Sequence, residues 1–412
     1  MVRCHKVSLL GLLGGLLFIL MIFFTFQFPF FKLITILLII FIGYSKKKVF
    51  VAKKNANLII SFVFVNLVFT FNAFLNNNPA PIVRIGVDVI WPIIYLFLLS
   101  LIGRSFWRYF NTAIKYSLFI LILLGIVSTI YFNLFGPIDE GTFICSSSVR
   151  PDFPILALSG PCVVTFMIMY FYYFAHIIIS KSVFSLFDKS IIILGIVFIF
   201  LTSRRALYIN FFLFFIILGV INSKVRYKSR MVSKKIRKLF GYLVAFIVFV
   251  ILLLAYNEIL DTKMLQSFLE NIYVADNTDP RFEQQKALLD GWYDSFFIGN
   301  GPGVNAAVVR SDTTVGAYEL SYYAMLFSKG IIGFLFFWIM VFWLCKETLK
   351  TYRKDVFYQD SIPVITTLIL FLIANSSNPY LDSFDFEWIL FLPLVFINNY
   401  EKEKCRFINK SI

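Results

Sequence analysis

The feature that most constrains this fold is a series of long apolar runs. Each is roughly 17 to 25 residues long, close to the length with which an α-helix crosses the hydrocarbon core of a bilayer. Hydrophobic residues make up 59% of the 412 residues and charged residues 15%, with a mean hydropathy of +0.82. No soluble domain buries that much apolar surface. Because the backbone must satisfy its own hydrogen bonds in lipid, we expect an all-α, polytopic membrane protein.

The apolar pattern predicts about twelve transmembrane helices. The predicted spans are 8–26, 29–44, 57–75, 85–103, 113–132, 155–180, 190–202, 206–221, 240–256, 319–345, 361–376 and 386–398. They divide the chain into transmembrane helices 1–9 (1–256), one large outer loop with short amphipathic helices (257–318), and helices 10–12 with a tail (319–412). The first run lacks a small-residue cleavage site and another span follows at once, so we expect no cleavable signal peptide.

The distribution of basic residues predicts the orientation. With twelve spans, 28 of the 38 Lys and Arg residues fall on the side that holds both termini, and ten fall on the other side. Cytoplasmic loops carry the excess of Lys and Arg, so both termini are predicted to be cytoplasmic and the 257–318 loop to face outward. The net charge of +15 is therefore a topology signal and does not indicate a nucleic-acid partner.

Cysteine and histidine patterns add little. The five cysteines show no CxxC or Cys/His metal spacing, and a Cys145–Cys162 disulfide is conceivable but not favoured. The isolated His176 is better explained as a satisfied intramembrane histidine than as a base. The chain contains no P-loop, Rossmann fingerprint, metalloprotease helix or nucleophile elbow, so we expect neither a cofactor nor ATP-driven transport.

Arg204 and Arg205 form the first candidate site. They stand on the predicted outer side, in a link too short to carry them far into water. A plain interpretation is that both side chains reach lipid headgroups. Adjacent outer arginines without nearby acids instead favour an anion site, since a guanidinium holds phosphate oxygens through two parallel hydrogen bonds.

Arg281 and the following segment form the second candidate. On a helical wheel, Arg281 falls on the apolar side with Phe282, Leu288, Leu289, Trp292 and Phe296. The alternative is an arginine at a helix start that points to water. The Gly299–Gly303 stretch then predicts a sharp turn. Its backbone N–H groups offer contacts to an anion, although the same turn could simply return the chain.

Glu319, beside Tyr318, Ser321 and Tyr322, forms the third candidate. A carboxylate that enters lipid is costly and is usually paired or functional. Low polarity favours the protonated form of a carboxyl group, which suits a residue that must accept a proton. The alternative is an acid that interacts with the helix dipole. Asp88, inside a predicted span, is a weaker candidate on the same grounds.

These residues resemble the O-antigen polymerase and ligase superfamily. The resemblance rests on Arg281 with Trp292, the Gly299–Gly303 turn, the Glu319–Tyr322 sequence, Lys329–Gly333, and Arg204–Arg205 between two spans. It implies a bacterial inner-membrane protein whose large loop faces the periplasm and whose substrates are glycans on undecaprenyl diphosphate. Ligases of this family usually carry a histidine in the outer loop, and this chain has none there. The resemblance therefore favours the repeat-unit polymerase of the Wzy type.

The resemblance also implies roles for individual residues. Arg281 with Arg204 or Arg205 would stabilise the leaving diphosphate, and Glu319 would take the proton from the acceptor hydroxyl. One-step displacement would invert the anomeric centre without a metal ion. Substrate contacts are expected from Trp292, Tyr318, Tyr322, Gly301, Gly303 and Arg310. The expected partners are lipid-linked donor and acceptor glycans, the bilayer, and a chain-length regulator protein.

Two alternatives stay open at this stage. An O-antigen ligase would use a lipid A core as its acceptor. A flippase for lipid-linked oligosaccharides would be expected to have an internal repeat and polar or broken helices at the bilayer midplane. The sequence shows neither, and its polar chemistry lies in one outer loop.

Overall fold

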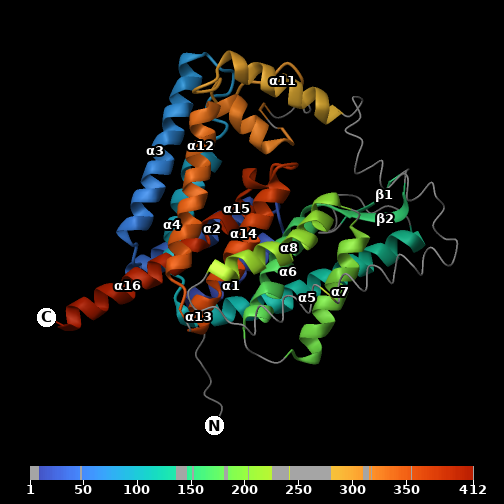
Figure 1. The fold of residues 1–412 in the computed structure, drawn as a ribbon, viewed down its shortest axis with the longest axis vertical. Coiled ribbons are helices and arrows are strands. Elements are labelled where there is room, and N and C mark those ends of the chain that lie inside the picture. The colour runs from blue at the N-terminus through green and yellow to red at the C-terminus, as the bar shows by residue number, and fades with distance from the viewer. Residues whose placement is uncertain are drawn as a thin grey trace, which may run out of the picture.

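The computed structural model of the chain describes residues 9–46, 49–135, 146–150, 153–180, 184–202, 204–224, 241, 280–309, 315–316, 318–353 and 355–411. These residues form a helical bundle with one small β-hairpin (Figure 1). The predicted span 240–256 and the residues 257–279 lie outside the described part, apart from position 241.

The helices agree with most of the predicted spans. They are α1 (Leu9–Phe23), α2 (Pro29–Ser45), α3 (Lys53–Leu75), the π-helical turn η1 (Gly86–Ile90), α4 (Trp91–Ser100), α5 (Arg104–Phe135), α6 (Pro161–Ile179), α7 (Leu186–Leu201), α8 (Arg205–Lys224), α11 (Pro280–Asp294), α12 (Ser321–Lys350), α13 (Val356–Gln359), α14 (Ser361–Asn375), the 3₁₀ turn η2 (Tyr380–Asp382), α15 (Phe384–Phe391) and α16 (Pro393–Ser411). The hairpin pairs β1 (Ser146–Arg150) with β2 (Phe153–Ser159) in antiparallel register.

Six helices among the described residues are long and apolar enough to cross a membrane. They are 53–75, 106–131, 161–179, 206–223, 321–350 and 357–375. Shorter apolar helices cover 9–23, 29–45 and 86–100. Large apolar side chains such as Phe41, Phe64 and Phe342 point outward from this bundle and are at least 65% exposed. The described helices therefore support a multi-pass helical membrane protein, whereas a count of twelve spans stays a prediction.

Two predicted spans are wrong in detail. Span 155–180 begins too early, because its first residues belong to β2 and α6 starts at Pro161. Gly160 precedes it with φ 91°, a backbone conformation that glycine adopts readily, and proline fits the first position of a helix. Span 386–398 is divided, since α15 ends at Phe391 and Pro393 starts α16.

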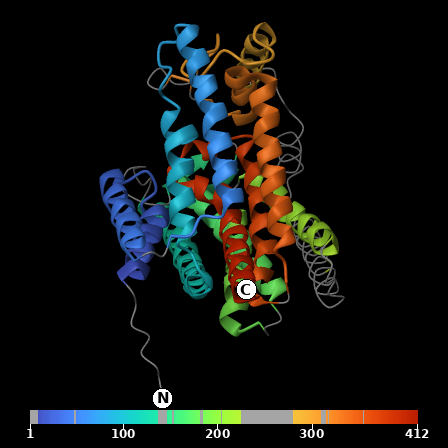
Figure 2. The same ribbon diagram turned by 90° about the vertical axis from the view of Figure 1, so that its left-hand side faces the viewer.

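The loops fall into two groups at opposite ends of the bundle. At one end, Lys54 forms ion pairs with Glu347 at 3.2 Å and Glu401 at 2.9 Å, which joins the start of α3 to the end of α12 and the middle of α16. At the other end, the Asn78 amide donates to the carbonyl of Asn300 at 2.9 Å. There α11 packs on the start of α12 (Figures 1 and 2).

Helix α6 forms the centre of the bundle. Buried residues make up 94% of its most apolar window, and it packs against α5, α8 and α14. His176 on this helix contacts Asp360 Oδ1 through Nδ1 at 2.5 Å, which confirms the interpretation of a satisfied histidine. Cys162 is disulfide-bonded, with a partner outside the described residues, so a disulfide does form at a position where the sequence did not favour one.

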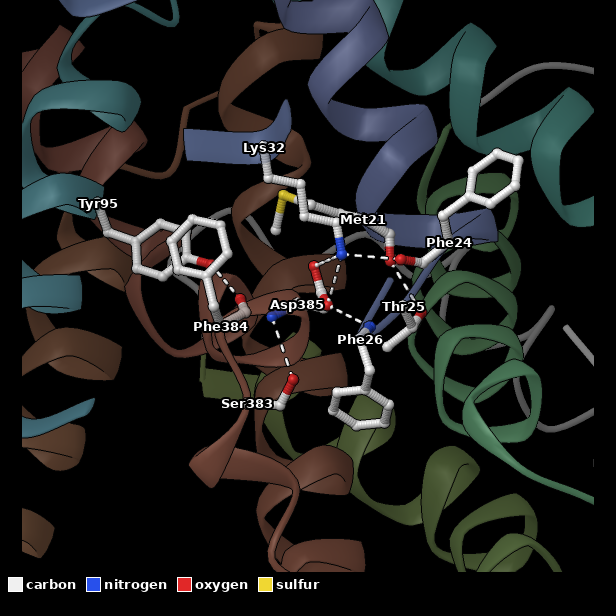
Figure 3. A network of polar contacts seen from close by, with 9 residues as sticks. All are labelled: Met21, Phe24, Thr25, Phe26, Lys32, Tyr95, Ser383, Phe384 and Asp385. Atoms are coloured by element: carbon white, nitrogen blue, oxygen red, sulfur yellow. Dashed lines mark hydrogen bonds and ion pairs between the residues drawn. The ribbon is translucent and has the colours of Figure 1, made fainter. Parts of the chain in front are cut away.

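A buried ion pair fastens the α1–α2 hairpin to the bundle (Figure 3). Lys32 Nζ lies 2.8 Å from Asp385 Oδ1, with side-chain exposures of 6% and 5%. The Lys32 ammonium also donates to the carbonyl of Phe24 at 2.8 Å, and Asp385 accepts from the Phe26 N–H at 2.9 Å. A buried charge needs such complete pairing, so this network fixes how the hairpin docks.

Candidate functional site

Helix α11 brings Arg281 to Glu319. Arg281 is the second residue of α11, and Glu319 stands two residues before α12 begins. Arg281 Nε lies 2.6 Å from Glu319 Oε2, with side-chain exposures of 44% and 18%. The carboxylate therefore lies ahead of the first turn of α12 and contacts a guanidinium, which favours an ionic role over the helix-dipole interpretation.

The face of α11 that packs on α12 differs from the predicted one. Leu288 and Gln284 are buried, whereas Phe282 and Phe296 are 43% and 40% exposed. A Cβ at Gly291 would come within 2.6 Å of the Phe327 ring, so this glycine permits the close approach of the two helices. The buried face follows the contact with α12, and apolarity alone did not predict it.

The glycine turn has a packing role. The N–H groups of Asn300 and Gly301 donate to the carbonyls of Phe327 and Ser328, both at 2.9 Å. Gly301 and Gly303 have φ +79°, and a Cβ at Gly303 would stand 1.8 Å from the Ala80 carbonyl oxygen. The first N–H groups of the turn are thus used within the protein, which favours the interpretation that the turn returns the chain. A substrate contact by Gly301 or Gly303 stays a prediction.

Helix α12 is broken at Gly330, where the sequence predicts a continuous span. Gly330 has φ 60° and ψ −171°. The turn after α11 occupies the break, since the N–H groups of Ile331 and Ile332 donate to the carbonyls of Phe296 and Phe297 at 2.9 and 3.2 Å. The expectation that no span is broken was therefore wrong.

Tyr380 lies within the electrostatic influence of both Arg204 and Arg281. Burial raises the pKa of its phenol, and the two guanidinium groups act in the opposite direction. Arg204 immediately precedes α8, and Arg205 is the first residue of that helix. The side chain of Arg205 and the whole of Arg310 lie outside what the structure describes. Arg204 and Arg281 thus share an electrostatic effect on one phenol, that of Tyr380.

The three predicted aromatic contacts have different surroundings. Trp292 is partly buried and stacks on Phe296, with ring centroids 4.9 Å apart. Tyr318 is 4% exposed, and its hydroxyl accepts from the Ala306 N–H. Tyr322 donates to the Leu372 carbonyl at 2.6 Å, which ties α12 to α14. Trp292 and Tyr322 are thus partly buried, Tyr318 is buried, and the two hydroxyl groups already have protein partners.

Two features of the site go beyond the predictions, which named Asp88 only as a weaker candidate and did not name Tyr380. Tyr380 belongs to a short loop. The only sequence signal for it was its position between Pro379 and Asp382 on the predicted outer side. The second is a buried charged group around Asp88, whose Oδ1 lies 2.8 Å from Lys329 Nζ. Asp88 is thus held in an ion pair. Within the described ranges, no group of three or more His, Cys, Asp or Glu side chains is arranged to hold a metal ion.

Comparison with protein-family models and with curated proteins gave no match for this chain. The resemblance to the polymerase and ligase superfamily therefore rests on the sequence motifs alone.

Proposed function

We propose that this protein polymerises oligosaccharide repeat units carried on undecaprenyl diphosphate into a surface polysaccharide such as O-antigen. The observation that supports this most is the Arg281–Glu319 contact of 2.6 Å at the end of the bundle. It joins a cation suited to phosphate with a carboxylate suited to accept a proton. Arg204, which like Arg281 acts on Tyr380, supplies a second cation in this neighbourhood.

The proposed reaction is a single displacement. The acceptor hydroxyl oxygen forms a bond to the anomeric carbon of the donor as the bond from that carbon to the diphosphate oxygen breaks. The diphosphate leaves with the electron pair, and Arg281 and Arg204 stabilise its charge. Glu319 takes the acceptor proton, and the anomeric centre is inverted. Arginines carry the electrostatic part in this scheme, so it needs neither a metal ion nor a cofactor.

The proposal also includes the finer topology. We place the protein in the bacterial inner membrane with about twelve spans, both termini in the cytoplasm and residues 257–318 in the periplasm. The charge distribution along the sequence supports this orientation. Donor and acceptor are both lipid-linked glycans, and a chain-length regulator is the expected protein partner.

Transport of a lipid-linked oligosaccharide is the second candidate function. It is favoured by the break in α12 at Gly330 and by the buried charges beside it, since transporters build their sites from discontinuous helices. A transporter would move its substrate without changing it. The polymerase would lengthen the glycan in detergent, where no gradient exists.

A test that separates the two uses purified wild-type protein and lipid-linked repeat units in detergent. The polymerase proposal predicts a ladder of products longer than one unit, with one undecaprenyl diphosphate released for each new bond. Unchanged substrate, together with movement of the same lipid across reconstituted vesicles, would establish transport instead.

A further inference from the structure

A cavity of about 90 Å³ lies at the start of α12, and charged side chains are set into its otherwise largely apolar wall. Tyr318 and Ser321, the residues that flank Glu319 and Leu320, line it. The wall also carries five charged side chains, which are Arg84, Asp88, Lys329, Asp382 and Glu387. A volume of this size holds several water molecules or the hydroxyl groups of a ligand. Charged groups inside a membrane domain are costly and are usually functional.

Four of these five charged groups pair with one another. Lys329 Nζ lies 2.8 Å from Asp88 Oδ1 and donates to Asn66 Oδ1 at 2.7 Å. Arg84 Nη1 lies 2.6 Å from Asp382 Oδ2, and its Nε lies 3.7 Å from Asp88 Oδ2. Arg84 and Asp382 have side-chain exposures of 27% and 34%, against 10% and 9% for Lys329 and Asp88. The Arg84–Asp382 pair therefore lies nearer the surface, and the Lys329–Asp88 pair lies deeper.

Glu387 is the exception. It is 3% exposed, and its Oε2 has no hydrogen-bond partner. Asn375, which also lines the cavity, uses its carbonyl oxygen on the Leu381 N–H, but its Nδ2 has no hydrogen-bond partner. Leaving buried polar atoms unsatisfied is costly. A hydroxyl group donates one hydrogen bond and accepts others, so it suits a carboxyl oxygen and an amide N–H₂ alike.

Two backbone irregularities border this cavity. Asp88 lies in the π-helical turn η1, and Lys329 immediately precedes the break at Gly330. Irregular backbone at membrane depth is tolerated where it is buried in protein or lines a polar cavity, and π-turns often occur at functional sites. Both irregularities put a charged residue on the same cavity, which is the arrangement expected of a ligand site.

We propose that this cavity is the acceptor subsite and binds hydroxyl groups of the acceptor sugar. This inference rests on the polymerase function proposed above. The lining has three acids and two bases, so it disfavours a diphosphate and suits an uncharged sugar ring. Because Tyr318 and Ser321 belong both to this wall and to the surroundings of Glu319, a sugar held here presents a further hydroxyl to the base.

The test compares Glu387→Gln with Thr366→Val. Thr366 lies on α14. Like Glu387, it is buried and has a side-chain oxygen without a hydrogen-bond partner, but it does not line the cavity. The probe is the repeat-unit oligosaccharide released from its lipid, which lacks the diphosphate, and binding is followed by calorimetry. Glu387→Gln should weaken binding by roughly tenfold or more, because an amide N–H₂ replaces one of the two carboxyl oxygens that can pair with a ligand hydroxyl. Thr366→Val should bind as wild type does. Equal affinities in wild type and Glu387→Gln, or equal losses in both variants, would overturn the subsite.

A second measurement uses the unaltered chain, in case Glu387→Gln fails to fold. Dicyclohexylcarbodiimide modifies buried membrane carboxyl groups, and peptide mass spectrometry quantifies the adduct at Glu387. The oligosaccharide should slow this modification, whereas an unchanged rate at saturating oligosaccharide would contradict the proposal. Failure of wild-type protein to lengthen lipid-linked units would remove the polymerase function, while these binding and protection results judge the subsite separately.

Discussion

Arg281 and Glu319, 38 positions apart in the chain, meet through Nε and Oε2 at 2.6 Å. The contact joins the first turn of α11 to the residue that precedes the N-cap of α12. A diphosphate that binds Arg281 would compete with Glu319 for the guanidinium. The proposed reaction therefore couples the two residues, since donor binding releases the carboxylate that is to act as the base.

Replacement of Arg281 tests the electrostatic half of this scheme. Arg281→Ala should raise the barrier by about 2–4 kcal/mol, a loss of roughly 30- to 1,000-fold in turnover. Arg281→Lys should recover little, because a point charge cannot reproduce the planar fork. The measurement is turnover of purified protein on lipid-linked repeat units, with Lys286→Ala as an exposed control on the same helix. Normal product length in Arg281→Ala would remove this residue from the mechanism.

The break in α12 predicts a strict requirement for glycine at position 330. A Cβ there would stand 2.3 Å from the Phe297 carbonyl oxygen, and the φ of +60° is unfavourable for alanine. Gly330→Ala should lower the free energy of unfolding by at least about 1–2 kcal/mol, from the backbone conformation alone. The control is Gly219→Ala in α8, where a Cβ meets no atom within 4 Å. Thermal unfolding in detergent should distinguish the two, and equal midpoints would argue against the break.

The buried ion pair of Lys32 and Asp385 predicts a large effect from a single replacement. Lys32→Met leaves the Asp385 carboxylate buried without its cation, which should cost about 3–5 kcal/mol of stability. Lys54→Met removes a half-exposed lysine with a side-chain exposure of 51%, and its ion pairs should contribute only about 0–1 kcal/mol. Denaturant unfolding in mild detergent compares the two variants. Equal losses would mean that the network in Figure 3 does not fix the hairpin.

The orientation can be tested with exposed positions at the two ends of the bundle. Asp290→Cys lies on α11, and Lys350→Cys lies at the other end of α12. In a background without the exposed Cys405, Asp290→Cys should react with an impermeant maleimide in whole cells. Lys350→Cys should react only after permeabilisation. The reverse pattern would invert the predicted topology.

Most helices could be predicted from the sequence, because an apolar run long enough to cross a bilayer must form a helix there. It located Arg281 and Glu319 as separate candidates, but their contact depends on how α11 packs on α12, which no local pattern encodes. The break at Gly330 was missed because the residues after Lys329 stay apolar through it. Its backbone groups are satisfied by the 296–301 turn, a tertiary effect. The Gly160–Pro161 pair, by contrast, is a sequence signal for the true start of α6, and the predicted span 155–180 did not use it.

The role of Glu319 is the central claim, and turnover of Glu319→Gln tests it most directly. Glutamine keeps the size of the side chain but cannot accept the acceptor proton. Purified wild type and variant are compared on lipid-linked repeat units, with rates normalised to folded protein and binding of the same lipid measured in parallel. The account predicts retained binding and a loss of about 10²–10⁴ in turnover. Retention of more than about a tenth of wild-type turnover would contradict it, since a general base contributes far more than that.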